Sequence, residues 1–235
     1  MPLVIAHRGD SSAALENSRQ AISLALDHGV DMIELDIRKT ADNALFVMHD
    51  ATTGRTARED RRVETSTAAE LSGVRLRNGE SVPSLQDVLG FVAGRAGLNL
   101  EIKSTGAGQL VAREIAALRY TGYVLISSFH EQEVEGARSV LPRVPTSLIF
   151  DSLSARSVPA YRTKGHGIVS LKKSTVDARL IAACRSEGVK VYVWTIDAEK
   201  EMNAFIDLGV DGIYSNDPGL LRAVCDRRRA DSVSP

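Results

Sequence analysis

Two segments of the chain place histidines and carboxylates at the ends of apolar runs. The first is IAHRG at residues 5–9, and the second runs from residue 33 to residue 50. Together they contribute four groups suited to phosphate and metal chemistry, namely His7, Glu34, Asp36 and His49. An apolar run that ends in ionisable residues is typical of a buried strand whose carboxyl end opens into a site.

The spacing of Glu34 and Asp36 predicts that both carboxylates lie on one face of a strand. Side chains two residues apart point to the same side of a strand, with their Cα atoms about 7 Å apart. The two carboxylates are therefore placed to hold one cation. The polar stretch 40–43 is short enough for a hairpin turn, and the apolar run 45–48 then returns antiparallel. This return predicts that His49 lies beside the two carboxylates.

Short apolar runs alternate with amphipathic stretches along the chain. Strands are predicted at 3–6, 32–37, 98–102, 123–128, 146–150, 167–171, 190–195 and 212–215. Helical spacing occurs in most segments between them, for example at 16–28, 109–120 and 198–208. Strands that alternate with helices pair in parallel, and eight of them close an α/β TIM-type (β/α)8 barrel. A doubly wound open sheet is the alternative, weakened because no Gly-x-Gly-x-x-Gly turn follows the first strand.

The segment 44–49 falls outside the eight strands and is predicted to be a short hairpin arm after the second strand. Residues 50–84 interrupt the alternation and are rich in Thr, Arg, Glu and Asp. They are expected to be a small lid-like insertion with one short helical stretch at 66–71, capped by Ser66 or Thr67. Residues 1–225 are expected to form a single catalytic barrel domain, with 226–235 as a flexible tail.

Composition excludes several classes of function. The 235 residues are 43% hydrophobic and 25% charged with a formal net charge of −1, so neither nucleic acid nor an anionic membrane is attracted overall. No stretch approaches transmembrane length, and the first residues lack the features of a signal peptide, so a cytoplasmic location is expected. Cys184 and Cys225 have no metal-ligand spacing and are expected to be ordinary thiols. The oligomeric state stays open.

A third predicted strand ends in Glu101 and Lys103, which again share a face. Three carboxylates without cysteine or a His-x-His pair favour one hard divalent cation, Mg²⁺ or Ca²⁺, over zinc. Because three carboxylates leave net negative charge around one cation, a phosphate would also need Arg8 and Lys103 as counter-charges. The two histidines suit removal of a proton from an attacking hydroxyl and protonation of the leaving oxygen. The implied reaction is cleavage of a phosphodiester.

With these residues in place, the chain resembles the glycerophosphodiester phosphodiesterase family. The similarity rests on ordered pieces that span most of the sequence: HRG at 7–9, ENS at 16–18, ELD at 34–36, VMHD at 47–50, VPSL at 82–85, LEIK at 100–103, SSF at 127–129, VWT at 193–195 and DGIYSNDP at 211–218. A single piece such as HRG is a weak signal, whereas the ordered set is specific. The resemblance implies a TIM-type barrel with an insertion after the His-Asp pair.

The resemblance also implies a reaction and a set of residues. Family substrates are deacylated phospholipids such as glycerophosphocholine or glycerophosphoethanolamine, cleaved to glycerol 3-phosphate and an alcohol. A neighbouring glycerol hydroxyl is expected to attack first, giving a cyclic phosphate that water opens. The implied roles are acid–base catalysis by His7 and His49, binding of Mg²⁺ or Ca²⁺ by Glu34, Asp36 and Glu101, and phosphate binding by Arg8 and Lys103.

The chain departs from the family at Leu15, where the family usually has proline. This change affects the stiffness of the loop more than its chemistry, and Glu16 and Asn17 remain as expected supports behind the site. Trp194 is expected to line the leaving-group side or to stack on a choline cation, with packing in the barrel core as the alternative. Ser127 and Phe129 have the same two interpretations.

Other charged residues are expected to have no role in the chemistry. This group consists of the insertion arginines Arg55, Arg58, Arg61 and Arg62, expected on the solvated surface with recognition of the leaving group as the alternative, and of His28, His130 and His166, expected to be structural or superficial. Activity on lysophospholipids is a rival function, but it needs an apolar groove that the polar insertion does not suggest. A non-catalytic anion-binding barrel is disfavoured because both histidines and all three carboxylates are present. An amidohydrolase would carry a His-x-His pair on the first strand.

Overall fold

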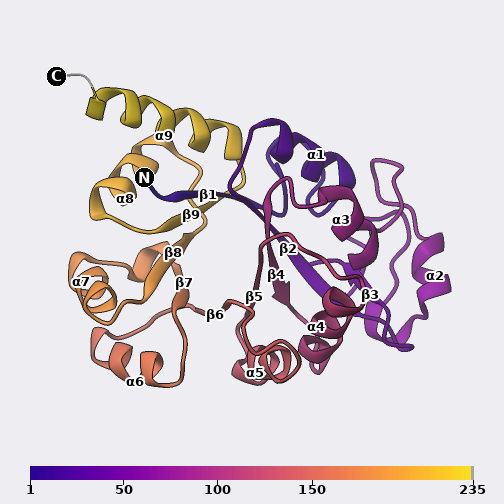
Figure 1. Ribbon diagram of the computed structural model, residues 1–235. Helices are drawn as coiled ribbons and strands as arrows, with labels where there is room; N and C mark the ends of the chain where they lie inside the picture. Colours follow the sequence, from indigo (N-terminus) through magenta and orange to yellow (C-terminus); the bar gives the residue numbers. More distant parts are fainter. Residues whose placement is uncertain (234–235) are drawn as a thin grey trace.

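Eight parallel strands close into a barrel, which confirms the predicted architecture. The computed structural model describes residues 1–233. The strands are β1 (Leu3–His7), β2 (Met32–Lys39), β4 (Gly97–Ile102), β5 (Val124–Ser128), β6 (Thr146–Phe150), β7 (Ile168–Lys172), β8 (Lys190–Trp194) and β9 (Gly212–Ser215). Each pairs in parallel with the next, and β1 pairs with both β9 and β2 to close the ring. Figure 1 shows this ring surrounded by helices.

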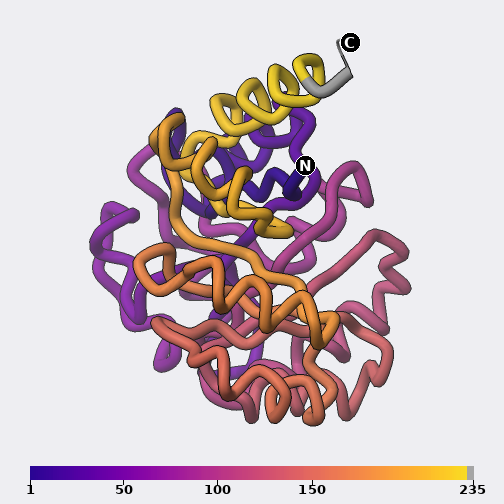
Figure 2. The backbone as a smooth tube through the Cα atoms, turned by 90° about the vertical axis from the view of Figure 1, so that its left-hand side faces the viewer, coloured from indigo at the N-terminus to yellow at the C-terminus, as the bar shows by residue number. Residues whose placement is uncertain are grey.

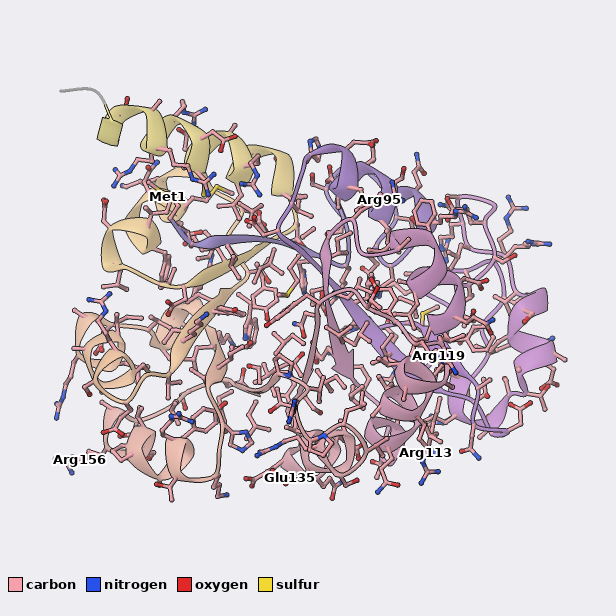
Figure 3. The ribbon with its side chains drawn as sticks, in the orientation of Figure 1. Met1, Arg95, Arg113, Arg119, Glu135 and Arg156 are labelled. Carbon is pink, nitrogen blue, oxygen red and sulfur yellow. The ribbon has the colours of Figure 1, made fainter. Side chains whose placement is uncertain are left out.

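Helices cover the outer face of the barrel. They are α1 (Arg19–Asp27), α3 (Leu85–Val92), α4 (Ala107–Ala117), α5 (Glu131–Val140), α6 (Val158–Thr163), α7 (Ala178–Ser186), α8 (Glu199–Leu208) and α9 (Pro218–Val233), with 3-10 turns η2 (Ala155–Ser157) and η3 (Lys173–Thr175). Apolar helix faces pack on the strands in the main core. The labelled Arg113, Glu135 and Arg156 lie at the outer edge of the molecule in Figure 3. No helix within residues 1–233 is both long and apolar enough to cross a membrane.

The interior of the barrel changes from apolar to polar toward the carboxyl ends of the strands. Because side chains two apart share a face, Ile5 lies below His7 on β1 and Ile168 lies below Ser170 on β7. A buried hydrogen-bonded layer follows, in which Asn99 and Ser170 both contact the hydroxyl of Tyr214 at 2.9 and 3.1 Å. This polar layer forms the floor on which the site is built.

The predicted hairpin arm is β3 (Leu45–Val47), which pairs antiparallel with β2 in the register Ile37↔Val47. The insertion continues from it through η1 (Val63–Thr65) and α2 (Ala68–Gly73), seen at the far right of Figure 1. Thr67, one of the two predicted caps, caps α2 in a capping box with Glu70. The insertion has an apolar cluster of its own, formed by Phe46, Met48, Ala57, Val63, Leu71, Val74, Leu76 and Val82. It is therefore a packed unit, and its movement as a lid stays a prediction.

The end of the chain, expected to be a flexible tail, is helical as far as residue 233, and its flexibility stays a prediction. Residues 226–233 are the last turns of α9, and residues 234–235 lie outside the described residues. Upstream, Leu221 and Val224 are buried against the barrel. In the arginine-rich last turns, Arg227 pairs with Glu199 of α8 at 2.6 Å. Figures 1 and 2 show α9, in yellow, at the periphery beside α8.

Candidate active site

The residues expected to act on phosphate come together at the carboxyl end of the barrel. Strand register places His7 of β1 opposite Glu34 of β2, and Asp36 opposite Glu101 of β4. A pocket opens here, lined by His7, Arg8, Glu34, His49, Asn99, Glu101, Lys103, Phe129, Ile149, Ser170, Trp194 and Tyr214. Segments far apart in the sequence thus share one cavity.

The three carboxylates form one buried group. Ligand oxygens of Glu34, Asp36 and Glu101 all lie within 4.8 Å of one another. Burial, followed by repulsion from Asp36, raises the pKa of Glu34 well above its usual value and that of Glu101 to about 7. Oε1 of Glu34 is buried without a hydrogen-bond partner among residues 1–233. Crowded oxygen donors with an unpartnered acceptor fit a hard divalent cation, so this group can hold a metal.

Two cations lie against the carboxylates. Lys103 Nζ lies 3.2 Å from Asp36 Oδ1 and also pairs with Glu101, while Arg8 Nε lies 3.2 Å from Asp36 Oδ2. Burial alone would raise the pKa of Asp36, but Lys103 and Arg8 outweigh it and lower that pKa. Burial likewise opposes the charge on Arg8 and Lys103, yet the nearby carboxylates raise the pKa of both. Two persistent positive charges therefore face the pocket, where a phosphate needs them.

The loop after β1 approaches the carboxylates closely. Arg8 has a φ of 61°, and its N–H donates to Glu34 Oε2 at 3.0 Å. Gly9 follows with a φ of 80°, and a Cβ there would lie 2.6 Å from the carbonyl carbon of Ala21. Asn17, with a φ of 59°, donates from Nδ2 to Asp36 Oδ2 at 2.8 Å. Left-handed backbone at two non-glycine residues thus coincides with direct support of the acidic group.

Both histidines present the same ring nitrogen to the pocket. His7 Nδ1 donates to Asn216 Oδ1 at 2.7 Å, and its Nε2 lies 4.0 Å from Glu34 Oε2. Burial, followed by the charge of Arg8, lowers the pKa of His7. His49 Nδ1 donates to Asp50 Oδ1, also at 2.7 Å. With Nδ1 engaged in each ring, Nε2 is the nitrogen available to a substrate.

The structure adds three supports that sequence reasoning missed. Asn216 follows β9 and donates from Nδ2 to Asp197 Oδ2 at 2.8 Å, which turns its amide oxygen toward His7. Asp50 directly follows His49 in the VMHD piece, so its position was a usable signal. Arg55 is exposed as expected, and it also bonds to Asp50 and to Glu16. Glu16 is 39 residues away, so no local pattern connects it to Arg55.

One side of the pocket is apolar. Trp194 at the end of β8 and Phe129 after β5 meet edge to face, with ring centroids 6.2 Å apart, and Ile149 lines the pocket beside them. Trp194 thus lines the pocket, as it must if it contacts the leaving group.

The remaining histidines have other surroundings. His28 contacts Asp10 at 3.0 Å, His166 is fully buried and stacks on Tyr161, and His130 is exposed just before α5.

The fold and this charge pattern define a TIM-type barrel with a candidate metal and anion site, and similarity to known proteins narrows the class. The model of the Glycerophosphoryl diester phosphodiesterase family matches residues 7–220. A glycerophosphodiester phosphodiesterase of Caldanaerobacter subterraneus subsp. tengcongensis is 31% identical, with 93% of this chain and 96% of the relative covered.

Solved structures agree. A glycerophosphodiester phosphodiesterase of Agrobacterium tumefaciens is 28% identical with a TM-score of 0.84, covering 95% of this chain and 100% of the other. A phosphodiesterase of Oleispira antarctica shares the fold with a TM-score of 0.89 at 23% identity, covering 96% of this chain and 97% of that one. The chain belongs to the glycerophosphoryl diester phosphodiesterase family and is a phosphoric diester hydrolase.

Proposed function

We propose that the protein hydrolyses glycerophosphodiesters such as glycerophosphocholine or glycerophosphoethanolamine to glycerol 3-phosphate and an alcohol. The supporting observation is the combination in one pocket of two imidazoles, two cations and the three-carboxylate group. Membership of the family supports the substrate class. The Oleispira antarctica relative is described in complex with the product sn-glycerol-3-phosphate, which supports the side of the diester that keeps the phosphate.

Binding of the diester depends first on charge. Arg8 and Lys103 attract the phosphate oxygens, and their own charge is maintained by the buried carboxylates beneath them. Glu34, Asp36 and Glu101 would hold Mg²⁺ or Ca²⁺, which when bound polarises a phosphoryl oxygen and stabilises developing negative charge. Glu16 and Asn17 keep Arg8 and Asp36 in place from behind.

Proton transfer is assigned to His7 and His49. One ring removes the proton from the neighbouring glycerol hydroxyl, whose oxygen then bonds to phosphorus. The ester bond to the head-group oxygen breaks as the other ring protonates that oxygen. Water next attacks the cyclic phosphate with the two rings in exchanged roles, which regenerates both protonation states and leaves glycerol 3-phosphate. The hydrogen bonds at Nδ1 hold each Nε2 in position for these steps.

The head group is assigned to the apolar side of the pocket. Trp194 offers a ring that suits a methylated ammonium, and Ile149 adds apolar surface beside it. Phe129 supports Trp194 edge to face, while Lys103 Nζ already lies over the Phe129 ring, 5.8 Å from its centroid. This arrangement favours choline among small head groups. The few apolar side chains that line the pocket offer less surface than an acyl chain would need, which argues against a lysophospholipid as the main substrate.

A head-group panel tests the proposal. The purified protein would be incubated with Mg²⁺ or Ca²⁺ and with glycerophosphocholine, glycerophosphoethanolamine or lysophosphatidylcholine, and products would be identified by phosphorus NMR. We expect glycerol 3-phosphate from the first two substrates. Absence of turnover with every substrate and both cations would refute the proposed activity. Release of phosphocholine in place of glycerol 3-phosphate would refute the assigned bond, and faster cleavage of the lysophospholipid would select the rival substrate class.

A further inference from the structure

We propose that Arg55 is a positioning residue through which the insertion holds both the phosphate-binding Arg8 and the proton-transferring His49. The inference rests on the proposed function, because these are the two residues whose placement it explains. It assigns to residues 50–84 a role other than covering the pocket.

The guanidinium of Arg55 is engaged on all of its nitrogens. Nη1 and Nη2 donate to the two carboxylate oxygens of Glu16 at 2.6 and 2.7 Å, in a bidentate pair. Nε donates to Asp50 Oδ2 at 2.5 Å. One planar group therefore joins a residue of the loop after β1 to a residue that follows the hairpin arm.

Each of these carboxylates has its second partner inside the pocket. Glu16 Oε1 also accepts from Arg8 Nη1 at 3.0 Å. Asp50 Oδ1 accepts from His49 Nδ1 at 2.7 Å. A continuous chain of hydrogen bonds thus runs from Arg8 through Glu16, Arg55 and Asp50 to His49.

The charges along this chain alternate in sign. The hydrogen bond from Arg55 is the largest cause that lowers the pKa of Asp50, to about 2, so this carboxylate stays ionised where His49 needs an acceptor. The pKa of Glu16 is also lowered, because Arg55 and Arg8 outweigh the effect of its burial. An isolated exposed ion pair contributes little, but a bidentate pair within a network restricts geometry more strongly.

The insertion also fixes the backbone that carries Arg55. Arg77 donates to the carbonyl oxygens of Arg55 and Gly54, both at 2.9 Å. The N–H of Gly54 donates to Asp60 at 3.0 Å. The side chain of Arg55 is 49% exposed, so its orientation depends on these bonds and on its two carboxylate partners more than on packing.

Steady-state kinetics with glycerophosphocholine test the proposal through KM and kcat separately. Arg55→Met should raise KM and lower kcat, with a loss in kcat/KM on the order of a hundredfold, because both ends of the chain are released. Glu16→Gln should act mainly on KM through Arg8, and Asp50→Asn mainly on kcat through His49. Arg55→Lys keeps the charge but cannot bond both carboxylates, so it should restore only part of the loss.

Arg61→Met is the matched control. Arg61 is another arginine of the insertion, and its ion pairs with Glu59 and Glu70 stay within that segment. This variant should keep both kinetic constants within about twofold of the wild type. Thermal unfolding of every variant separates misfolding from misplacement.

Two outcomes would overturn the inference. One is an Arg55→Met variant that matches Arg61→Met in kcat and KM while the wild type is active. The other concerns the double variant Arg55→Met with Asp50→Asn. Its loss in kcat should be smaller than the product of the two single losses, because both residues belong to one chain of hydrogen bonds, and a loss equal to that product would overturn the inference. A wild type inactive on the whole panel refutes the proposed function instead.

A spectroscopic measurement tests the inference without turnover. Long-range proton–nitrogen NMR spectra of the histidine rings would be compared between the wild type and Arg55→Met. The ring nitrogens of His49 should shift, whereas those of His28, which bonds to Asp10 outside the chain of contacts, should not. Unchanged His49 signals would overturn the inference even if the enzyme assay failed.

Discussion

The two imidazoles of the pocket are held by different kinds of structure. His7 ends β1, and its partner Asn216 follows β9, so both belong to neighbouring strands of the closed barrel. His49 follows the hairpin arm, and its partner Asp50 is held by Arg55 of the insertion. The insertion has its own small apolar cluster, distinct from the main core. The ring of His7 is therefore held within the barrel. The backbone of His49 is bonded to Arg38 of β2 at 2.9 Å, but its ring is oriented through an appended segment.

The partners of the two rings also differ in charge. An amide oxygen accepts the Nδ1–H of His7, whereas a carboxylate accepts that of His49. The two imidazoles are thus unequal in both mechanical and electrostatic surroundings, although each presents Nε2 to the pocket.

Removing either ring should have the largest effect. His7→Ala and His49→Ala should each lower kcat on the order of 10³-fold, because each abolishes one proton transfer. Steady-state rates with glycerophosphocholine measure this directly. Turnover near the wild-type rate in either variant would remove that histidine from its assigned role and break the pairing on which the comparison rests.

Glu34→Gln, on a strand of the barrel, should increase stability and decrease activity. Burial and the neighbouring carboxylates raise the pKa of Glu34 in the folded chain. At neutral pH, where this group is ionised in the unfolded chain, the raised pKa therefore lowers the free energy of unfolding. Glutamine removes that cost and should increase the free energy of unfolding in chelator by on the order of 1 kcal/mol. Turnover should fall sharply at the same time. Denaturant titration measures the first effect, and a less stable variant would contradict the crowding inferred for this group.

Leu71→Ala should show that the insertion is a separate mechanical unit. Leu71 is fully buried in the insertion cluster, and its truncation should cost about 2–5 kcal/mol locally. Backbone hydrogen exchange should then quicken within residues 50–84, and kcat should fall roughly tenfold as His49 loses its support. The matched control is Leu221→Ala, equally buried in α9 but remote from the arm, which should destabilise the fold and leave kcat unchanged. Equal kinetic losses in both variants would contradict the distinction.

Trp194→Leu should have the smallest effect. Loss of one ring face should raise KM for glycerophosphocholine by about fivefold, as expected for one exposed cation–π contact. Glycerophosphoethanolamine, whose ammonium is better hydrated, should be affected less. An equal change in KM for both substrates would place Trp194 in packing rather than in head-group recognition.

Alternation along strands explains why much of the molecule was predictable. The strands predicted at 146–150 and 212–215 coincide with β6 and β9, because a short segment with several apolar residues between helical stretches is typical of a buried parallel strand. The same two-residue period indicated that Glu34 and Asp36 share a face. Closure of the barrel then follows from the number of strand–helix units.

Contacts between distant, irregular segments were not predictable in this way. Arg55 lies in a segment whose polar, charged composition is typical of the surface. Only the path of the insertion in the folded structure brings it to Glu16. Asn216 follows a strand, but its role depends on Asp197 turning its amide. The arginines at the end of α9 have no apolar periodicity, so no signal in the sequence indicated that the helix continues to residue 233.

The central claim is tested most directly by a metal titration. Ca²⁺ or Mg²⁺ would be added to chelator-treated protein, and turnover of glycerophosphocholine would be followed in the same samples. The claim is that the three carboxylates of Glu34, Asp36 and Glu101 bind one cation, and that this cation is required for the reaction that the two imidazoles catalyse. We expect binding of one cation per chain, turnover that rises with its occupancy, and loss of both in Asp36→Asn. Full turnover after thorough chelation, or unchanged cation binding in Asp36→Asn, would contradict the account.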